Sequence, residues 1–240
     1  MSEPISNPVK PDKRLNKTAR GLFRATGNIS KPVIVDLIDG EAVYAEHLER
    51  EKDDFYPTPI EPIRALLAYE GNRIDSLHSV WEPAAGDGVL IGELEDFGLK
   101  VHASDLVDRG CGAQIKDFYE FTPKSKPFSS AIITNPPFDQ CQSSADAKWQ
   151  RHAFGLGISY MALLLPLNFA GAATLAGFWN DHAPARVYLM RWRIDFTGQG
   201  APPMLNAWYV WDGQTDPSDT RFLMMDRKDW RQGNLFGDGQ

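Results

Sequence analysis

Residues 79–105 read SVWEPAAGDGVLIGELEDFGLKVHASD, and this stretch decides the fold. Its apolar run up to Glu82 predicts a strand, because aromatic and β-branched side chains favour extended backbone. A glycine-rich turn follows, and Val89 to Phe97 then predict a helix that ends at Gly98. A second strand ends at Asp105. Strand, turn, helix and strand in this order indicate an α/β fold with a parallel sheet.

The same alternation continues toward the C-terminus. Residues 129–138, SSAIITNPPF, predict a third strand, and residues 145–157 predict a helix. The nearly all-apolar SYMALLLPL at 159–167 is typical of a strand buried in the middle of a sheet. The remaining expected elements are a helix of small residues at 170–179 and an antiparallel pair of strands at 185–192 and 205–212.

A further helix is expected before the first strand. Thr58 is a candidate N-cap and Pro59 a candidate first helical residue. Three apolar side chains at helical spacing follow, and Gly71 is expected to end the helix; the three are Ile63, Leu66 and Leu67. The short apolar run within 31–40 predicts an edge strand.

Composition and charge limit the class of protein. The 240 residues are 42% hydrophobic and carry a net charge of -7. Residues 1–31 hold seven basic and two acidic side chains, so a basic segment precedes an acidic body. That asymmetry favours a polyanionic partner, although a solubilising tail would have the same composition. We expect a disordered basic arm at 1–30, one domain at 31–228 and a flexible tail at 229–240.

Membrane and disulfide classes are disfavoured. We find no run of about 18 apolar residues and no apolar core of a signal peptide near the start. Cys111 and Cys141 form no Cys-x-x-Cys pair, so we expect reduced thiols, a cytoplasmic location and no metal site.

The glycine-rich turn predicts a nucleoside-binding site. Its backbone can approach a ligand closely, and the helix that it opens offers free N–H groups. Asp105 lies 17 residues beyond Gly88 and can bind the two hydroxyls of a ribose. Ile91 stands where a dinucleotide fingerprint would need glycine, and no Gly-Lys-Ser/Thr of a P-loop is present. An ordinary turn between strand and helix remains the alternative.

The charge of the turn indicates which nucleoside it binds. Glu82 and Asp87 would repel a pyrophosphate. They suit a ligand with a positive sulfonium and an amino group, and S-adenosylmethionine is such a ligand. We therefore expect S-adenosylmethionine as the cofactor.

A second motif, Asn135-Pro136-Pro137-Phe138, ends the third strand. Proline donates no ladder hydrogen bond, so the strand stops there. The Asn135 side chain and the Pro136 carbonyl then present two acceptors, with the Phe138 ring close by. This arrangement suits a planar molecule with an exocyclic NH₂ group. The alternative is a Pro-Pro loop with a core phenylalanine.

Together these residues resemble the amino-methyltransferases that use S-adenosylmethionine, especially the DNA adenine-N6 methyltransferases. The resemblance covers residues 54–138 in the family's unpermuted order. It rests on Tyr56-Pro57-Thr58-Pro59, Glu82 to Gly88, Asp105, Asp117-Phe118 and Asn135 to Phe138. It implies a Rossmann-like class I methyltransferase fold, with a mixed seven-stranded sheet and helices on both faces.

The resemblance also implies site residues. The implied cofactor site comprises Tyr56, Thr58, Glu82, Pro83, Ala84, Gly86, Gly88, Asp105, Leu106, Asp117, Phe118 and Asn135. The implied catalytic residues are Asn135, Pro136, Pro137 and Phe138. Within this set, Tyr56 and Thr58 line the methionine end, Asp105 takes the ribose, and Asp117 and Phe118 contact the adenine. The family often has tyrosine where Phe138 stands, and phenylalanine keeps the stacking face.

The implied substrate is an adenine flipped out of DNA. Residues 138–150 and about 195–206 are the segments expected to read the target. The expected phosphate contacts are the N-terminal basic residues, Lys148, Arg151, Arg191 and Arg193. Cytosine-C5 chemistry is disfavoured because no cysteine follows a proline. The alternatives are bases of RNA, a protein glutamine side chain, and a nucleic-acid-binding module without activity.

The C-terminal residues carry one further resemblance. Gln232, Leu235 and Phe236 are similar in spacing to the Gln-x-x-Leu-Phe peptides that bind the bacterial sliding clamp. The alternative is a segment that folds back on the core.

Overall fold

The computed structural model describes residues 33–35, 42–44, 57–142, 146–196, 204–215 and 219–233. The chain divides into two compact units, Met1–Lys52 and Asp53–Gln240. The expected basic arm, Tyr56, Leu235 and Phe236 lie outside the described residues. In the first unit, β1 (Val33–Val35) pairs antiparallel with β2 (Ala42–Tyr44) in a two-stranded sheet of their own. The strand expected within 31–40 therefore exists, but it is not an edge of the larger sheet.

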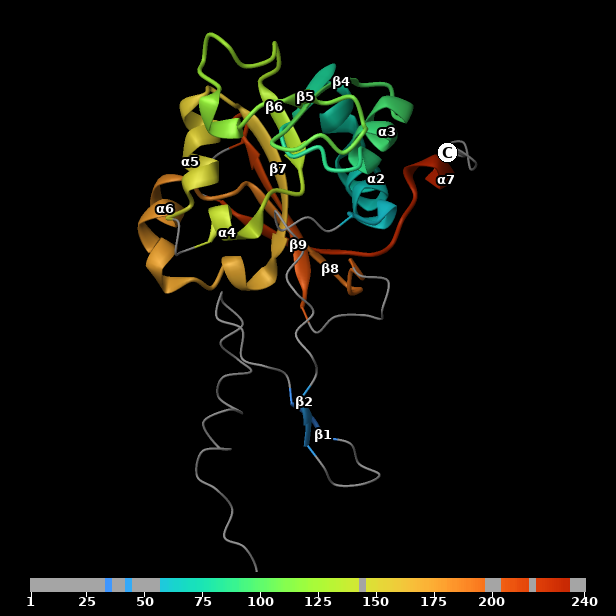
Figure 1. The fold of residues 1–240 in the computed structure, drawn as a ribbon, viewed down its shortest axis with the longest axis vertical. Coiled ribbons are helices and arrows are strands. Elements are labelled where there is room, and N and C mark those ends of the chain that lie inside the picture. Colours follow the sequence, from blue (N-terminus) through green and yellow to red (C-terminus); the bar gives the residue numbers. More distant parts are fainter. Residues whose placement is uncertain are drawn as a thin grey trace, which may run out of the picture. The chain divides into compact units, whose positions relative to one another are not determined.

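The second unit is built on an eight-stranded sheet with the order β10-β8-β9-β7-β6-β3-β4-β5 (Figure 1). Its strands are β3 (Ser79–Glu82), β4 (Lys100–Asp105), β5 (Gln114–Ile115), β6 (Ala131–Thr134), β7 (Tyr160–Pro166), β8 (Arg186–Met190), β9 (Asn206–Asp212) and β10 (Arg221–Met225). Strand β9 is antiparallel to both of its neighbours, and the other described pairings are parallel. The mixed sheet and the antiparallel late pair are confirmed, but the sheet has eight strands and not the expected seven. The short strand β5 and the edge strand β10 were not expected.

The strand directions create a site at one edge. The carboxyl ends of all strands except β9 lie on the same side, which we call the carboxyl edge. From β3 the chain adds β4 on one side and later β6 on the other. The strand order therefore reverses beside β3, and ligands of open α/β sheets bind at such a reversal.

Helices cover both faces of the sheet (Figure 1). One face carries α2 (Ile60–Asp75), α3 (Val89–Asp96) and α7 (Trp230–Gly233), and the other carries α4 (Phe138–Cys141), α5 (Lys148–Gly155) and α6 (Ala176–Asp181). Three 3₁₀ turns complete the described elements: η2 (Phe118–Glu120), η4 (Leu167–Phe169) and η5 (Ala173–Leu175). None of the helices in the described ranges combines the length and apolar character that a membrane span needs.

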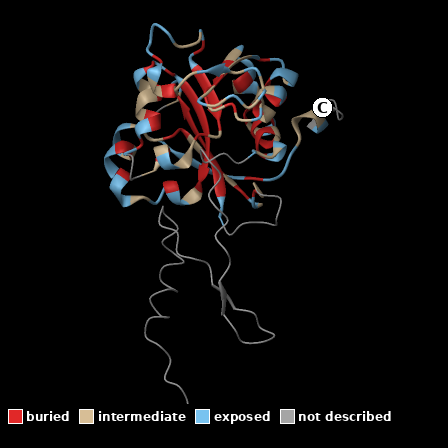
Figure 2. Ribbon diagram, viewed as in Figure 1, coloured by how far each residue is buried: buried red, intermediate tan, exposed pale blue. Residues whose placement is uncertain are grey.

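Two apolar clusters hold these layers together, one on each face. The buried residues are concentrated in the central strands (Figure 2). Every residue of β7 and β9 is buried, as expected for strands covered on both sides. Two of the fully buried indoles donate hydrogen bonds: Trp81 donates to the Ser104 hydroxyl at 3.0 Å and Trp208 to the Pro62 carbonyl at 2.9 Å.

The predicted ends of the helices are right in one case and wrong in another. Gly98 follows α3 with a φ of +105°, a conformation that glycine adopts without strain, so this end is confirmed. Helix α2 begins at Ile60 without a side-chain cap and continues past Gly71 to Asp75. Thr58 is therefore not the N-cap, and Pro59 precedes the helix. Gly71 instead lies against the Phe97 ring, where a methyl group would approach to 3.3 Å.

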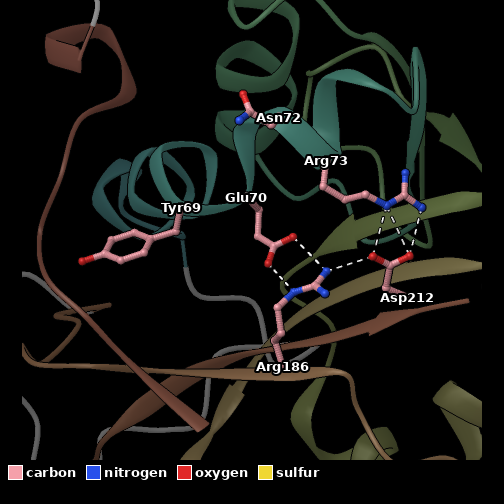
Figure 3. A pocket seen from close by; sticks show the side chains of 6 residues that line it. All are labelled: Tyr69, Glu70, Asn72, Arg73, Arg186 and Asp212. Carbon is pink, nitrogen blue, oxygen red and sulfur yellow. Dashed lines mark hydrogen bonds and ion pairs between the residues drawn. The ribbon is translucent and has the colours of Figure 1, made fainter. Parts of the chain in front are cut away.

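An ion cluster fixes α2 to the amino edge of the sheet, opposite the carboxyl edge (Figure 3). Arg186 donates to both carboxylate oxygens of Glu70 and, at 2.9 Å, to Asp212. Arg73 donates to Asp212 at 3.0 to 3.2 Å. Burial acts to raise the pKa of Asp212, but the hydrogen bonds from Arg73 and Arg186 outweigh it and lower that pKa.

The cluster borders a pocket of about 250 Å³ whose lining comprises Tyr69, Glu70, Asn72, Arg73, Arg186 and Asp212 (Figure 3). The two carboxylates and two guanidinium groups that line it neutralise each other. We therefore attribute a stabilising role to this cluster.

Arg186→Met is expected to lower the free energy of unfolding by about 3–5 kcal/mol, because it leaves the buried Glu70 carboxylate without its ion pair. Urea denaturation measures the change. Arg221→Met, at an exposed position on the neighbouring strand, is the control and should change stability by less than about 0.5 kcal/mol. The double variant Arg186→Met/Glu70→Leu should recover part of the loss; equal stability of all variants and wild type would contradict the role.

Candidate functional site

The reversal point gathers polar residues from three parallel strands. Glu82 ends β3, Asp105 ends β4, and Asn135 follows β6 directly. Strand β3 lies between the other two, with Glu82 in register with Ala103 of β4. The two motifs that the sequence analysis singled out therefore meet at the carboxyl edge.

Glycine is required in the turn after β3. Gly86 and Gly88 have φ values of +56° and +88°. A methyl group on Gly88 would lie 2.8 Å from Cβ of Cys111. The turn therefore depends on glycine for its conformation and for the close approach of the Cys111 loop.

Asp105 holds the turn from the next strand. One carboxylate oxygen accepts from the Gly86 amide at 2.8 Å and the other from the Val107 amide at 2.9 Å. A carboxylate has about four lone-pair positions, so two remain for further donors such as hydroxyl groups. Leu106 is 62% exposed beside it. These features fit the ribose and adenine end of the expected cofactor.

Glu82 is the most strongly perturbed acid of the site. The Ala84 amide donates to its Oε1 at 3.0 Å, and the Thr134 hydroxyl donates to the same oxygen. Its Oε2 is buried without a partner. Burial is the main cause that raises the pKa of Glu82 to about 8, and the Asp105 charge adds to it. With this pKa the carboxyl group is mostly protonated at pH 7, and no ion pair joins it to a basic side chain in the described part of the chain.

Asp117 and Phe118 lie close to the end of β4. The Lys116 amide donates to the Asp105 carbonyl at 2.8 Å, which brings the start of η2 to this edge. Asp117 caps η2 by accepting from the Tyr119 amide at 2.9 Å. The Phe118 ring is buried and stacks on Trp149 with centroids 4.3 Å apart. Phe118 therefore supports the core, and little of its ring is left to face a ligand.

In the Asn135 side-chain amide, the nitrogen is hydrogen-bonded and the oxygen is not. Its Nδ2 donates to Thr58 Oγ1 at 2.8 Å, and its Oδ1 is buried without a partner. The Phe138 ring lies edge-on to Phe196, with centroids 6.4 Å apart. An unpartnered acceptor in a motif that also carries an aromatic ring suits a planar ligand that carries an N–H donor.

The remaining residues of the expected site differ in how far they are buried. Pro83 and Pro136 are buried, and Ala84 and Pro137 are half-buried. Sequence reasoning did not single out Thr134 or the contact of Cys111 with the turn, and it placed Phe196 only within the segment 195–206 that was expected to read the target. Thr134 directly precedes the Asn-Pro-Pro-Phe motif, so its position at the strand end was a usable signal. Nothing in the local pattern indicates the contacts of the other two.

The expected phosphate contacts have partners within the chain. The Lys148 ammonium lies 3.8 Å from the centre of the Tyr119 ring, and Arg151 pairs with Asp146 at 3.4 Å. Arg191 pairs with Asp226 at 3.3 Å. These pairs are exposed and cost little to exchange for a phosphate. In the described ranges, no three His, Cys, Asp or Glu side chains gather as a metal site.

Comparison with known proteins gives the fold. No protein-family model and no curated protein matches the chain. A solved structure, a candidate RNA methyltransferase from Pyrococcus horikoshii, aligns with a TM-score of 0.50 and 19% identity, over 69% of this chain and 88% of that one. The chain thus has the Rossmann-like fold of class I methyltransferases.

Two further solved structures align less well. One is a modification subunit of a candidate type I restriction enzyme from Vibrio vulnificus, with a TM-score of 0.48, 12% identity, and coverage of 71% of this chain and 47% of that one. The other is the methyltransferase subunit of a type I restriction-modification system from Streptococcus thermophilus. It aligns with a TM-score of 0.47 and 13% identity, over 78% of this chain and 49% of that one. This chain spans about half the length of each.

Glu82→Gln should change how stability depends on pH. In the wild type the folded-state pKa near 8 exceeds the unfolded value near 4.5, so stability falls as pH rises between them and levels off above 8. Glutamine does not titrate. Between pH 6 and pH 9 the wild type should therefore lose about 3 kcal/mol of unfolding free energy relative to the variant. Urea denaturation across this range measures it, and parallel stability curves would contradict a buried neutral Glu82.

Proposed function

We propose that this chain transfers a methyl group from S-adenosylmethionine to the N6 amine of adenine in DNA. The observation that carries the proposal is the buried, unpartnered Oδ1 of Asn135 at the carboxyl edge, in the motif that also carries the Phe138 ring. An unsatisfied buried acceptor costs roughly 1–3 kcal/mol, and a donor from a ligand would remove that cost. The exocyclic amine of a nucleobase is such a donor on a ring that can stack.

The cofactor site is proposed at the adjoining turn. The cofactor would supply an electrophilic methyl group on a positive sulfonium. The unpartnered Oε2 of Glu82 fits the ammonium of its amino-acid portion, since a cation there would stabilise the carboxylate. The two free lone-pair positions of Asp105 fit the ribose hydroxyls.

The residues of the amine pocket would assist direct attack by nitrogen. Asn135 Oδ1 and the Pro136 carbonyl would each accept one N–H of the amine, which stabilises positive charge as it develops on nitrogen. Alignment of the reacting atoms would supply much of the remaining acceleration. No thiol nucleophile is invoked, because Cys141 is fully buried and burial raises its pKa, which makes it a poor nucleophile.

Nucleic acid as the substrate class is supported by exposed basic side chains near this edge. Lys148 and Arg151 lie in the first turn of α5, which follows the Asn-Pro-Pro-Phe motif, and Arg191 follows β8. A duplex would have to release the base, at a cost of a few kcal/mol, before the amine could reach Asn135.

The test is methyl transfer from tritiated S-adenosylmethionine to four substrates: duplex DNA, single-stranded DNA, RNA and a protein release factor that offers a glutamine side chain. Label in DNA that is recovered as N6-methyl-2′-deoxyadenosine after digestion would support the proposal. Label in RNA or in the release factor would instead identify RNA or protein as the substrate class. If none of the four substrates is labelled, the result would contradict methyl transfer as the function.

Asn135→Ala should lower the methyl-transfer rate by about 10²–10³, because one acceptor of the developing charge is lost. Binding of S-adenosylhomocysteine, measured by calorimetry, should change little. Asp105→Ala should instead weaken that binding by about 10-fold or more, as expected for loss of charged hydrogen bonds. Asn72→Ala, on the exposed part of α2 at the amino edge, is the control and should change neither. If the rate of Asn135→Ala lies within twofold of wild type, the result would contradict the assignment of Asn135 to the amine pocket.

A further inference from the structure

The side-chain amide of Asn135 is useful in only one of its two orientations. In the structure Nδ2 donates to Thr58 Oγ1 at 2.8 Å, and Oδ1 is buried without a hydrogen-bond partner. If the amide rotated by half a turn, Nδ2 would take the place of Oδ1. An amine that donates N–H bonds would then meet another N–H donor, and the acceptor would be lost.

Thr58 is the contact that can select the orientation. A hydroxyl group both donates and accepts, so an isolated Thr58 would tolerate either end of the amide. Once another group takes up the hydroxyl proton, only the lone pairs remain for Asn135. The Nδ2 end must then face Thr58, and Oδ1 must face the pocket. A carboxylate is the strongest acceptor for such a proton, and the proposed cofactor carries one in its amino-acid portion.

We propose that Thr58 is a positioning residue, which holds the Asn135 amide with its oxygen toward the target amine once a carboxylate in the cofactor site accepts the Thr58 hydroxyl proton. This rests on the proposed function of the same site. It gives Thr58 a role beyond lining the cofactor: the residue makes the amine pocket complete only when the cofactor site is filled. It also explains why Thr58 forms no cap on α2, since its oxygen is bonded to Asn135 instead.

The first experiment measures the amide directly, without activity. In ¹⁵N-labelled protein, the side-chain NH₂ signal of Asn135 is assigned as the pair that Asn135→Asp removes. Saturation with S-adenosylhomocysteine should slow hydrogen exchange of this NH₂ group by roughly 2- to 12-fold, the effect of one net hydrogen bond. Thr58→Ser should keep the slowing and Thr58→Val should lose it. Equal exchange rates in the wild type and Thr58→Val with the ligand bound would overturn the proposal.

The second experiment separates positioning from cofactor binding. At saturating concentrations of both substrates, Thr58→Val should lower kcat by roughly 2- to 12-fold, and Thr58→Ser should restore it to within about twofold. A raised cofactor Kd with unchanged kcat would show that Thr58 only binds the cofactor, and would overturn the proposal.

Two controls test whether the effects are specific to Thr58. Thr220→Val removes a hydroxyl that donates to the Pro184 carbonyl at the amino edge, and it should leave kcat unchanged. Thermal unfolding of each variant shows whether it is folded, and Thr58→Ser keeps the proposal testable if Thr58→Val is not. If wild-type protein methylates none of the substrates, the proposed function fails, while the NH₂ exchange rates still decide the role of Thr58.

Discussion

The hydrogen bond from the Thr134 hydroxyl to the Glu82 carboxyl group joins the ends of β6 and β3 where the strand order reverses. It ties the glycine-rich turn to the Asn-Pro-Pro-Phe loop, although 52 positions separate the two residues. Beyond this bond, each loop has one buried oxygen without a partner, Glu82 Oε2 and Asn135 Oδ1. Both oxygens favour ligands that bring N–H groups or positive charge, so the polarity of the site follows from how the strand ends meet.

The ion cluster and the proposed site lie at opposite edges of the sheet. At the amino edge the ion cluster around Arg186 satisfies its own charges. At the carboxyl edge the polar groups are only partly satisfied. Helix α2 connects the two edges: its last turns carry Glu70 and Arg73, and Thr58 lies just before its start. Its 16 residues span about 24 Å, so anchoring one end limits how far Thr58 can move from Asn135.

Local sequence pattern predicts most of the elements and some of their ends, but not the partners of side chains. The strands before Glu82 and Asp105 follow from apolar runs, and Gly98 follows from the need for a positive φ. The Thr58-Pro59 pair precedes a helix in the manner of a cap, and only the contact with Asn135 shows that the hydroxyl is used elsewhere. Strand β10 was missed because Phe222 and Met224 are exposed on an edge strand, where burial does not shape the pattern.

The unsatisfied groups of the carboxyl edge lower the stability of the ligand-free protein, and this cost is connected to selectivity. With a pKa near 8, Glu82 keeps its proton at pH 7 until a cation replaces it. A neutral ligand of the same shape would leave that carboxyl group protonated and would gain no ion pair. A cation would instead lower the Glu82 pKa, release the proton and gain a charge-assisted contact in a buried setting. In the proposed cofactor site, the same burial that destabilises the Glu82 carboxylate would therefore let the turn distinguish a cationic ligand from a neutral one.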